Sequence, residues 1–472
     1  MNRLAVINVV GLTESLIGEH TPRIAAFRCG GALAAIAPAF PAVTCTAQSN
    51  YLTGKTPAQH GVVGNGWFNR ELAEVQFWKQ SNHIVHAPKI WDELCARVPD
   101  FTCANCFWWF NMYSSVDFSI TPRPMYHADG RKFFDVYSWP YSIREEIKKD
   151  LGEFPFFSFW GPAAGLDSPQ GKADCASRWI AESAKWIENK YSPTLNLIYL
   201  PHLDYSLQRH GTYDASENLN PKIHRDLHEI DAIVGDLIDF FDRRGMPVVL
   251  LSEYGITNVD TPVHLNRIFR QHGWLTVKDE LGREILDAGA SKVFAVADHQ
   301  VAHIYLNDRS LEKSVRELLE KTSGVEKILG NAEKIAAGID HPRAGDLMAV
   351  AQENAWFTYY YWLDDARAPD FARTVDIHRK PGYDPAELFL NPKIPLPKLK
   401  IAWRLLQKKL GQRMLMDVIP LDATLVKGSH GRRPAGKKDW PVFITSQPEF
   451  LAAQQVESTE VHQILLWHFG SL

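Results

Sequence analysis

The sequence predicts an α/β protein, a three-layer α/β/α sandwich in which a central, mostly parallel sheet lies between two layers of helices. Three short apolar segments, Leu4–Val10, Leu195–Leu200 and Pro247–Ser252, are typical of strands that are buried on both faces. Between the last two, residues 223–241 carry apolar side chains spaced four and three apart, as in a helix that packs on one face. Because strands and helices alternate, we expect parallel strands joined by helical crossovers.

Shorter signals place the neighbouring elements. Ala34–Ala39 is a further apolar segment, and a helix is expected behind it from Gln48 onward. The helix of residues 223–241 is expected to end at the two arginines of residues 243–244 and at Gly245. Cations stabilise the last turn of a helix, and glycine readily adopts the conformation that terminates it.

The length and composition fit one large domain. The chain has 472 residues, of which 45% are hydrophobic and 22% are charged, enough to build an α/β domain with insertions. We interpret residues 1–472 as this single domain. Residues 107–160, rich in aromatic side chains and proline, and residues 356–438, which carry a basic helix at 397–412, are interpreted as insertions over the carboxyl edge of the sheet.

Charge and hydropathy limit the expected partners. A formal net charge of −4 gives no general attraction to nucleic acid or to an anionic membrane. No apolar segment approaches the roughly 20 residues that a membrane helix needs, and the N-terminal segment lacks a small-residue cleavage site. We therefore expect a cytoplasmic protein that binds neither a nucleic-acid polymer nor a membrane.

The six cysteines do not have the spacing of a disulfide framework. Cys103 and Cys106 have the C-x-x-C spacing of redox and zinc sites. They open the apolar run CFWWF, however, and no second C-x-x-C accompanies them. Buried, unreactive thiols are the expected outcome.

Polar residues follow several of the predicted strands. These residues are 8–11, 44–46, 202–204 and 253–255. Catalytic and binding groups of parallel sheets gather at the carboxyl ends of the strands. The sequence therefore predicts that these four segments meet at one edge of the sheet.

The segment from Thr44 to Asn65 carries the most specific motif of the chain. It contains Thr53-Gly54, Pro57 and the run HGVVGN at fixed spacings. This segment resembles the nucleophile segment of the type I phosphodiesterase/nucleotide pyrophosphatase family, part of the alkaline phosphatase superfamily. The resemblance implies an alkaline-phosphatase-like fold.

The resemblance also implies a reaction: the metal-dependent hydrolysis of phosphate esters, phosphodiesters or pyrophosphates through a phospho-threonine intermediate. Aligning the motif makes Thr44 the nucleophile, not Thr46. Asn65, with the backbone of Thr44, is then expected to hold the phosphoryl oxygens, and Tyr254 is expected to contact the substrate. The predicted partner is a small-molecule phosphate ester or diester. The oligomeric state is left open.

The resemblance further implies that the protein binds divalent metal ions. Zinc is the expected metal, and the family binds two ions. Asp204, Glu253 and His430 match metal-ligand positions. Three other ligand positions carry Val10, Gln208 and Tyr254, which bind metal weakly or not at all; a single ion is therefore the alternative to two. Asn8 is a further weak candidate ligand.

Two other pairs are candidates to replace the missing ligands. Asp298 and His299 precede a predicted strand, and Asp376 and His378 share one face of an alternating stretch. Either pair would supply a carboxylate and an imidazole. Among the other histidines, the i, i+4 pair His224 and His228 is explained by helix packing, and His60 is expected to be a structural hydrogen-bonding group.

The sequence leaves three possible functions. The favoured one is the metal-dependent hydrolase. The second is a binding or scaffold protein on the same fold, since Val10, Gln208 and Tyr254 are changes that loss of catalysis would leave. The third keeps catalysis but changes the substrate to a phosphonate or a sulfate ester.

Overall fold

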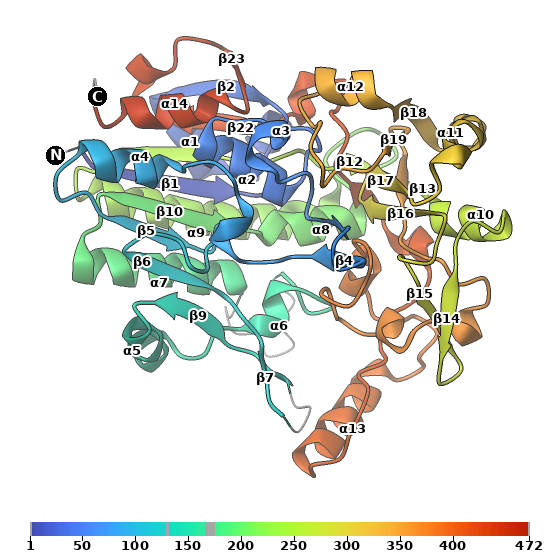
Figure 1. Ribbon diagram of the computed structural model, residues 1–472. Coiled ribbons are helices and arrows are strands. Elements are labelled where there is room, and N and C mark those ends of the chain that lie inside the picture. Colours follow the sequence, from blue (N-terminus) through green and yellow to red (C-terminus); the bar gives the residue numbers. More distant parts are fainter. Residues whose placement is uncertain (1, 129–131, 166–174, 471–472) are drawn as a thin grey trace.

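A nine-stranded sheet runs through the centre of the computed structural model, which describes residues 2–128, 132–165 and 175–470 (Figure 1). β1 lies between β10 and β11 and is parallel to both, so the three strands predicted from apolar segments are interior strands of one sheet. β22 is antiparallel to its two neighbours, and the sheet is therefore mixed but mostly parallel. Across the sheet the order is β23 (Gln455–Glu457), β2 (Ala32–Ala37), β22 (Val442–Thr445), β11 (Val248–Leu251), β1 (Leu4–Val9), β10 (Leu195–Leu200), β5 (Cys103–Cys106), β6 (Phe118–Pro122) and β9 (Val136–Trp139).

Helices cover both faces of this sheet, which confirms the predicted sandwich (Figure 1). One layer contains α7 (Ala176–Tyr191) and α9 (His224–Asp242), which pack on each other and on the central strands. The other contains α2 (Thr44–Thr53) and α14 (Glu460–Trp467), which also pack together. The predicted spacing in α9 is explained by burial, since side chains such as Leu227, Ile230, Val234 and Leu237 are fully buried. No helix in the described ranges has the length and apolar character needed to cross a bilayer.

A smaller antiparallel sheet forms beside the main one and has its own hydrophobic core. Its order is β16 (Val293–Asp298), β17 (Val301–Leu306), β19 (Leu347–Ala351) and β18 (Val325–Leu329). A tight turn joins β16 to β17 and contains His299, whose φ of 63° lies in the left-handed region. This turn carries Asp298 and His299 to the edge of the main sheet.

Two expected boundaries differ from the structure. Residues 107–160, interpreted as an insertion, contribute β6 and β9 to the main sheet, and Phe107 and Trp108 are fully buried in its core; residues 129–131 of this segment lie outside the described residues. The helix expected from Gln48 begins earlier, at Thr44, because the extended backbone of Val43 precedes it directly. Cys103 and Cys106 are buried free thiols, as predicted.

Residues 356–438 are largely irregular, as expected. They contain short 3-10 turns and one longer helix, α13 (Pro397–Lys409), which ends three residues before the predicted boundary. The stretch around Asp376 and His378, interpreted as alternating, forms a turn rather than a strand. A strand-like arrangement of these two side chains is therefore not present.

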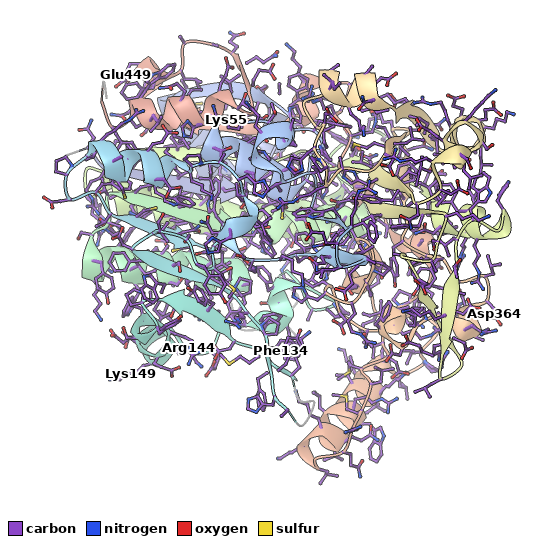
Figure 2. All side chains as sticks on the ribbon, in the orientation of Figure 1. Lys55, Phe134, Arg144, Lys149, Asp364 and Glu449 are labelled. Carbon is purple, nitrogen blue, oxygen red and sulfur yellow. The ribbon has the colours of Figure 1, made fainter. Side chains whose placement is uncertain are left out.

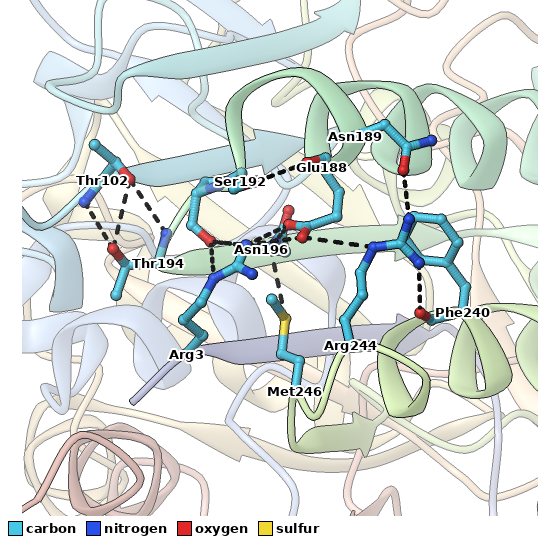
Figure 3. A network of polar contacts seen from close by, with 11 residues as sticks. Arg3, Thr102, Glu188, Asn189, Ser192, Thr194, Asn196, Phe240, Arg244 and Met246 are labelled. Atoms are coloured by element: carbon cyan, nitrogen blue, oxygen red, sulfur yellow. Dashed lines mark hydrogen bonds and ion pairs between the residues drawn. The ribbon is translucent and has the colours of Figure 1, made fainter. Parts of the chain in front are cut away.

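A polar network ties α7 to the amino-terminal end of the main sheet (Figure 3). Glu188 of α7 is buried and forms an ion pair with Arg3, at 2.7 Å between Oε2 and Nη2. The side-chain amide of Asn196 in β10 donates to the same carboxylate at 3.1 Å. Arg244 packs over the ring of Phe240, its guanidinium carbon 3.6 Å from the ring centroid. This network lies at the edge opposite to the polar residues of the predicted site.

Candidate active site

Thr44 is the first residue of α2 and lies at the carboxyl edge of the main sheet. Its buried hydroxyl is 3.1 Å from the hydroxyl of Tyr254 and lies beside the side chains of Glu253 and Tyr199. Thr46 is turned elsewhere, since its hydroxyl donates to the carbonyl of Val62 at 3.3 Å. Of the two threonines, only Thr44 therefore faces the carboxylates of the site.

Asn65 is held in a fixed orientation next to Thr44. Its Oδ1 accepts from the backbone N–H of Cys45 at 3.1 Å. Its Nδ2 donates to Oδ1 of Asp298 at 3.1 Å, and its backbone N–H donates to Oδ2 of the same residue at 2.8 Å. A primary amide carries two N–H groups, so Nδ2 keeps a second donor for a ligand.

Asp204, in the first turn of α8 (His202–His210), accepts hydrogen bonds from two neutral side chains. Oδ1 accepts from the hydroxyl of Tyr254 at 3.1 Å, and Oδ2 accepts from Nε2 of Gln208 at 2.8 Å. Nε2 of His430 lies 3.8 Å from Oδ1. The three predicted ligands Asp204, Glu253 and His430 therefore surround one site, together with Thr44.

Four aromatic rings form a continuous stack beside Asp204. Tyr254, His430, His299 and Tyr383 follow one another with ring centroids 3.6, 3.7 and 3.6 Å apart. Both ends return to the same carboxylate: Tyr254 donates to it directly, and Tyr383 exchanges hydrogen bonds with Gln208. This four-ring stack links the main sheet to the turn between β16 and β17.

The two imidazoles of the stack have their tautomers fixed by hydrogen bonds. Nδ1 of His430 donates to the carbonyl of Ala42 at 2.8 Å, and Nδ1 of His299 donates to Oδ1 of Asp298 at 2.8 Å. In each ring Nε2 then carries a lone pair, and it is buried without a hydrogen-bond partner among the described residues. Burial lowers the pKa of both rings well below the usual value for histidine, which keeps them neutral.

The carboxyl groups of the site are unusually basic. Burial, and to a smaller extent the charge of Asp204, raises the pKa of Glu253 to about 8. Burial also raises the pKa of Asp204 to about 7 and that of Asp298 to about 6. Lys55, the cation of the Thr44–Asn65 motif, lies at the top of the molecule near α14 (Figure 2), where its charge acts on His462. It therefore does not neutralise these carboxylates.

The two-metal ligand set implied by the resemblance does not fit these residues. Val10 is buried in the core, while Gln208 and Tyr254 act as hydrogen-bond donors to Asp204. In the part of the chain that the structure describes, no group of three or more His, Cys, Asp or Glu side chains is arranged to hold a metal ion. Among the predicted ligands, Oδ1 of Asp204 and the unpartnered Nε2 of His430 lie 3.8 Å apart, and Oε2 of Glu253 and Nε2 of His299 are likewise buried without partners among the described residues.

The structure brings one of the two replacement pairs into the site. Asp298 orients Asn65, and His299 belongs to the four-ring stack. By contrast, His378 contacts the carbonyl of Phe77 at 3.4 Å, and the backbone N–H of Asp376 donates to Glu387. These contacts lie outside the network around Thr44.

The remaining histidines have structural surroundings. His224 and His228, both on α9, have ring contacts with His20, which precedes α1 (Pro22–Gly30). Nδ1 of His60 accepts from the backbone N–H of Val62 at 3.0 Å. Nδ2 of Asn8 donates to Oε1 of Glu253 at 2.7 Å, whereas its Oδ1, the expected weak ligand atom, is buried and has no hydrogen-bond partner among the described residues.

Sequence reasoning gave no role to two residues of the site. Gln48 donates to Oε1 of Glu253 at 2.5 Å and accepts from the backbone N–H of Trp109 at 2.6 Å. It lies four residues after Thr44, on the same face of α2, and this spacing was an available signal. Tyr383 reaches the site from a distant irregular segment, and no local pattern marks it.

The fold has a mostly parallel central sheet, and the polar residues of the site gather at its carboxyl edge around a threonine that begins a helix. Fold and site together define the class of the protein as a phosphoesterase-type hydrolase. A family model for type I phosphodiesterase/nucleotide pyrophosphatase matches residues 4–384, so the chain belongs to that family. No curated protein matches the chain by sequence.

Solved structures share the fold over nearly the whole chain. Murine ectonucleotide pyrophosphatase/phosphodiesterase 5, an inactive threonine-to-alanine variant in complex with AMP, is 13% identical with a TM-score of 0.58, covering 100% of this chain and 96% of that one. Phosphonoacetate hydrolase from Sinorhizobium meliloti 1021, in complex with phosphonoformate, is 14% identical with a TM-score of 0.58, covering 99% and 96%.

Proposed function

We propose that the chain hydrolyses small phosphate esters, phosphodiesters or pyrophosphates, with Thr44 as the nucleophile. The observation that carries this proposal is the position of Thr44. It is the first residue of α2, and its hydroxyl lies beside the basic carboxyl group of Glu253 and the phenol of Tyr254. A free threonine hydroxyl is a poor nucleophile at neutral pH, so it needs a group that removes its proton.

Glu253 is the candidate for that group. Oε1 already accepts from Asn8 and Gln48, whereas Oε2 is buried and has no hydrogen-bond partner among the described residues. A carboxyl group with a pKa of about 8 is a competent base close to neutral pH. In the proposed step the Thr44 proton moves to Glu253, the Thr44 oxygen bonds to phosphorus, and the bond from phosphorus to the leaving oxygen breaks. Water then hydrolyses the phospho-threonine.

Asn65 and the start of α2 are the proposed phosphate-binding elements. The second N–H of Asn65 Nδ2 is available for a phosphoryl oxygen, and Asp298 fixes the direction in which it points. The amino-terminal end of a helix also favours negative charge. Preorganised donors of this kind stabilise charge that develops during phosphoryl transfer.

We further propose a single divalent ion, zinc, rather than two. Asp204 and His430 would hold it, because His430 presents a buried lone pair 3.8 Å from Oδ1 of Asp204 and its Nδ1 is anchored to a backbone carbonyl, the arrangement typical of metal-binding histidines. When bound, such an ion supplies positive charge next to the phosphoryl oxygens.

The solved structures with this fold support the choice of phosphorus chemistry. One of them binds AMP, and it is inactive in the form in which a threonine is replaced by alanine. Another is a phosphonoacetate hydrolase that binds phosphonoformate. A phosphonate is therefore the second candidate substrate.

The test compares p-nitrophenyl phosphate, bis-p-nitrophenyl phosphate and p-nitrophenyl phenylphosphonate as substrates of the wild type, Thr44→Ala and Thr46→Ala. We expect Thr44→Ala to lower kcat by about a thousandfold or more, since loss of a nucleophile costs several orders of magnitude. Thr46→Ala is the matched control and should retain most activity, because its hydroxyl faces Val62.

Two results would overturn the proposal. If Thr44→Ala retains activity, another group is the nucleophile. If the folded wild type turns over none of the three substrates with or without added zinc, while AMP still binds at Thr44, the chain is a binding protein on this fold.

A further inference from the structure

Helix α13 (Pro397–Lys409) projects from the body of the molecule at its lower end in Figure 1, and none of its side chains is buried. An isolated helix of this length is marginal in water unless one face packs on something. The exposed side chains of α13 are therefore open to contact with a binding partner.

A row of large apolar side chains on α13 faces solvent. The residues are spaced 3, 4, 3 and 4 apart, which places them on one face of the helix. Their exposed fractions lie between 45% and 65%, so the row is largely uncovered. This apolar stripe consists of Leu396, Leu399, Trp403, Leu406 and Leu410.

The helix is attached to the protein through its charged side instead. Lys400 and Arg404 both pair with Asp417, at 2.8 Å and 3.0 Å between the nitrogen and carboxylate oxygen atoms. An amphipathic helix on a globular protein normally turns its apolar face inward. Here the ion pairs turn the apolar stripe away from the nearest part of the chain.

The charge around the apolar stripe indicates which kind of surface binds to it. Residues 388–417 contain seven cations and one carboxylate, that of Asp417, although the whole chain has a net charge of −4. The cations are Lys393, Lys398, Lys400, Arg404, Lys408, Lys409 and Arg413. Two copies of this helix placed face to face would repel each other, whereas an anionic lipid surface complements both the cations and the apolar stripe.

β7 lies at the lower side of the molecule in Figure 1, as α13 does, and two aromatic side chains of this region are exposed. Tyr126 in β7 (Met125–Tyr126) is 63% exposed, and Phe133 in β8 (Lys132–Phe133) is 40% exposed. The ammonium of Lys132 lies over the ring of Tyr126, 5.7 Å from its centroid. Aromatic rings with adjacent cations are typical of the membrane–water interface.

We propose that α13 is an interfacial helix that binds the surface of an anionic lipid bilayer, with its apolar stripe inserted among the lipids and its cations at the headgroups. The contact is peripheral, because a helix of 13 residues is about 20 Å long and does not span a bilayer. This proposal differs from the expectation, drawn from the net charge of the whole chain, that no membrane is bound.

The test is flotation of the full chain with vesicles of phosphatidylcholine, with and without phosphatidylglycerol. We expect binding to the vesicles that contain phosphatidylglycerol, and weaker binding as salt is raised. The variant Leu399→Glu/Trp403→Glu/Leu406→Glu should lose at least about tenfold in the fraction bound. The control Leu281→Glu/Ile335→Glu/Leu363→Glu changes three exposed apolar side chains elsewhere and should bind like the wild type.

Three outcomes would overturn the proposal. One is absence of binding to anionic vesicles, and a second is equal binding by the two triple variants. The third is a wild-type dimer that the α13 variant converts to monomer while vesicle binding is absent, which would make a second copy of the chain the occupant. Circular dichroism of both variants verifies that they are folded.

Discussion

The phenol of Tyr254 lies where the hydroxyl of Thr44 and the carboxylate of Asp204 face each other, 3.1 Å from an oxygen atom of each. Family resemblance places a histidine at this position and another at Gln208. In this chain both positions carry neutral hydrogen-bond donors to Asp204. In this structure both positions therefore provide hydrogen bonds to Asp204 where the resemblance implied metal ligands.

This replacement predicts the effect of restoring one imidazole. Gln208 lies four residues after Asp204 on α8 and on the same face. Gln208→His would add a third ligand to Asp204 and His430, the smallest set typical of a catalytic zinc site. We expect zinc affinity, measured by calorimetry, to rise by about tenfold or more.

The control for this gain is the double variant Gln208→His/His430→Gln. It should lose the added affinity, because it again leaves two ligands. Unchanged zinc affinity in Gln208→His would mean that Asp204 and His430 do not form a metal-binding pair.

Among the elements of the fold, α7 combines a buried apolar face with one buried carboxylate, that of Glu188. Glu188 receives hydrogen bonds from Arg3 and Asn196, and so it connects the helix to the first residues of β1 and to β10 (Figure 3). Removing one partner of a buried network leaves the others without hydrogen bonds. The helix layer on this face is therefore sensitive to one position.

We predict that Glu188→Gln lowers the free energy of unfolding by about 2–4 kcal/mol, because the paired guanidinium of Arg3 loses its counter-charge. Urea unfolding monitored by circular dichroism measures the change. Glu182→Gln, on the same helix but with its side chain 41% exposed and paired with Lys185, should change the free energy by less than about 1 kcal/mol. Equal effects of the two substitutions would show that the network does not stabilise the attachment of α7.

For the whole molecule, two buried neutral histidines make stability depend on pH. Burial lowers the pKa of His60 to about 3 and that of His303 to about 4, from an ordinary value of 6.5. The unfolded chain binds these protons first, so the stability that the neutral rings provide is complete above about pH 6.5 and is lost as the pH falls towards 4. The raised pKa values of Asp204 and Glu253 act in the opposite direction.

The comparison with His303→Gln isolates one of these rings. Glutamine can still donate to the carbonyl of Val63 and accept from the N–H of Gly345, the two hydrogen bonds of His303. We expect the wild type to lose about 1–3 kcal/mol more than this variant between about pH 7 and pH 5. Parallel stability curves for the two proteins would contradict this assignment.

The sequence predicts the interior of the molecule better than its edges. The spacing of apolar residues within a single element predicts burial for β1, β10, β11 and α9. The bounds of each of these elements agree with the prediction to within one or two residues. β9, at the edge of the sheet, and its neighbour β6 have no such pattern. Residues 107–160 were therefore interpreted as an insertion, although they extend the sheet.

The same division holds for the site. Thr44, Asp204, Glu253 and His430 follow from motif positions at strand or helix ends, and the structure brings them together. Tyr383 joins them because its ring packs on His299 and its hydroxyl exchanges hydrogen bonds with Gln208, contacts between segments far apart in the chain. No local spacing encodes a contact of this kind, and so it becomes visible only in the folded molecule.

The position of β22 in the main sheet also constrains the order in which the chain can fold during synthesis. This strand, residues 442–445, lies between β2 and β11, which are both made much earlier. Until it emerges from the ribosome, the facing edges of β2 and β11 have no neighbour, and unpaired edges invite pairing with other chains. Late, long-range strand insertion is also slow. A nascent chain of this protein therefore leaves the facing edges of β2 and β11 unpaired until residues 442–445 have been made, and we expect chaperones to bind it during that interval.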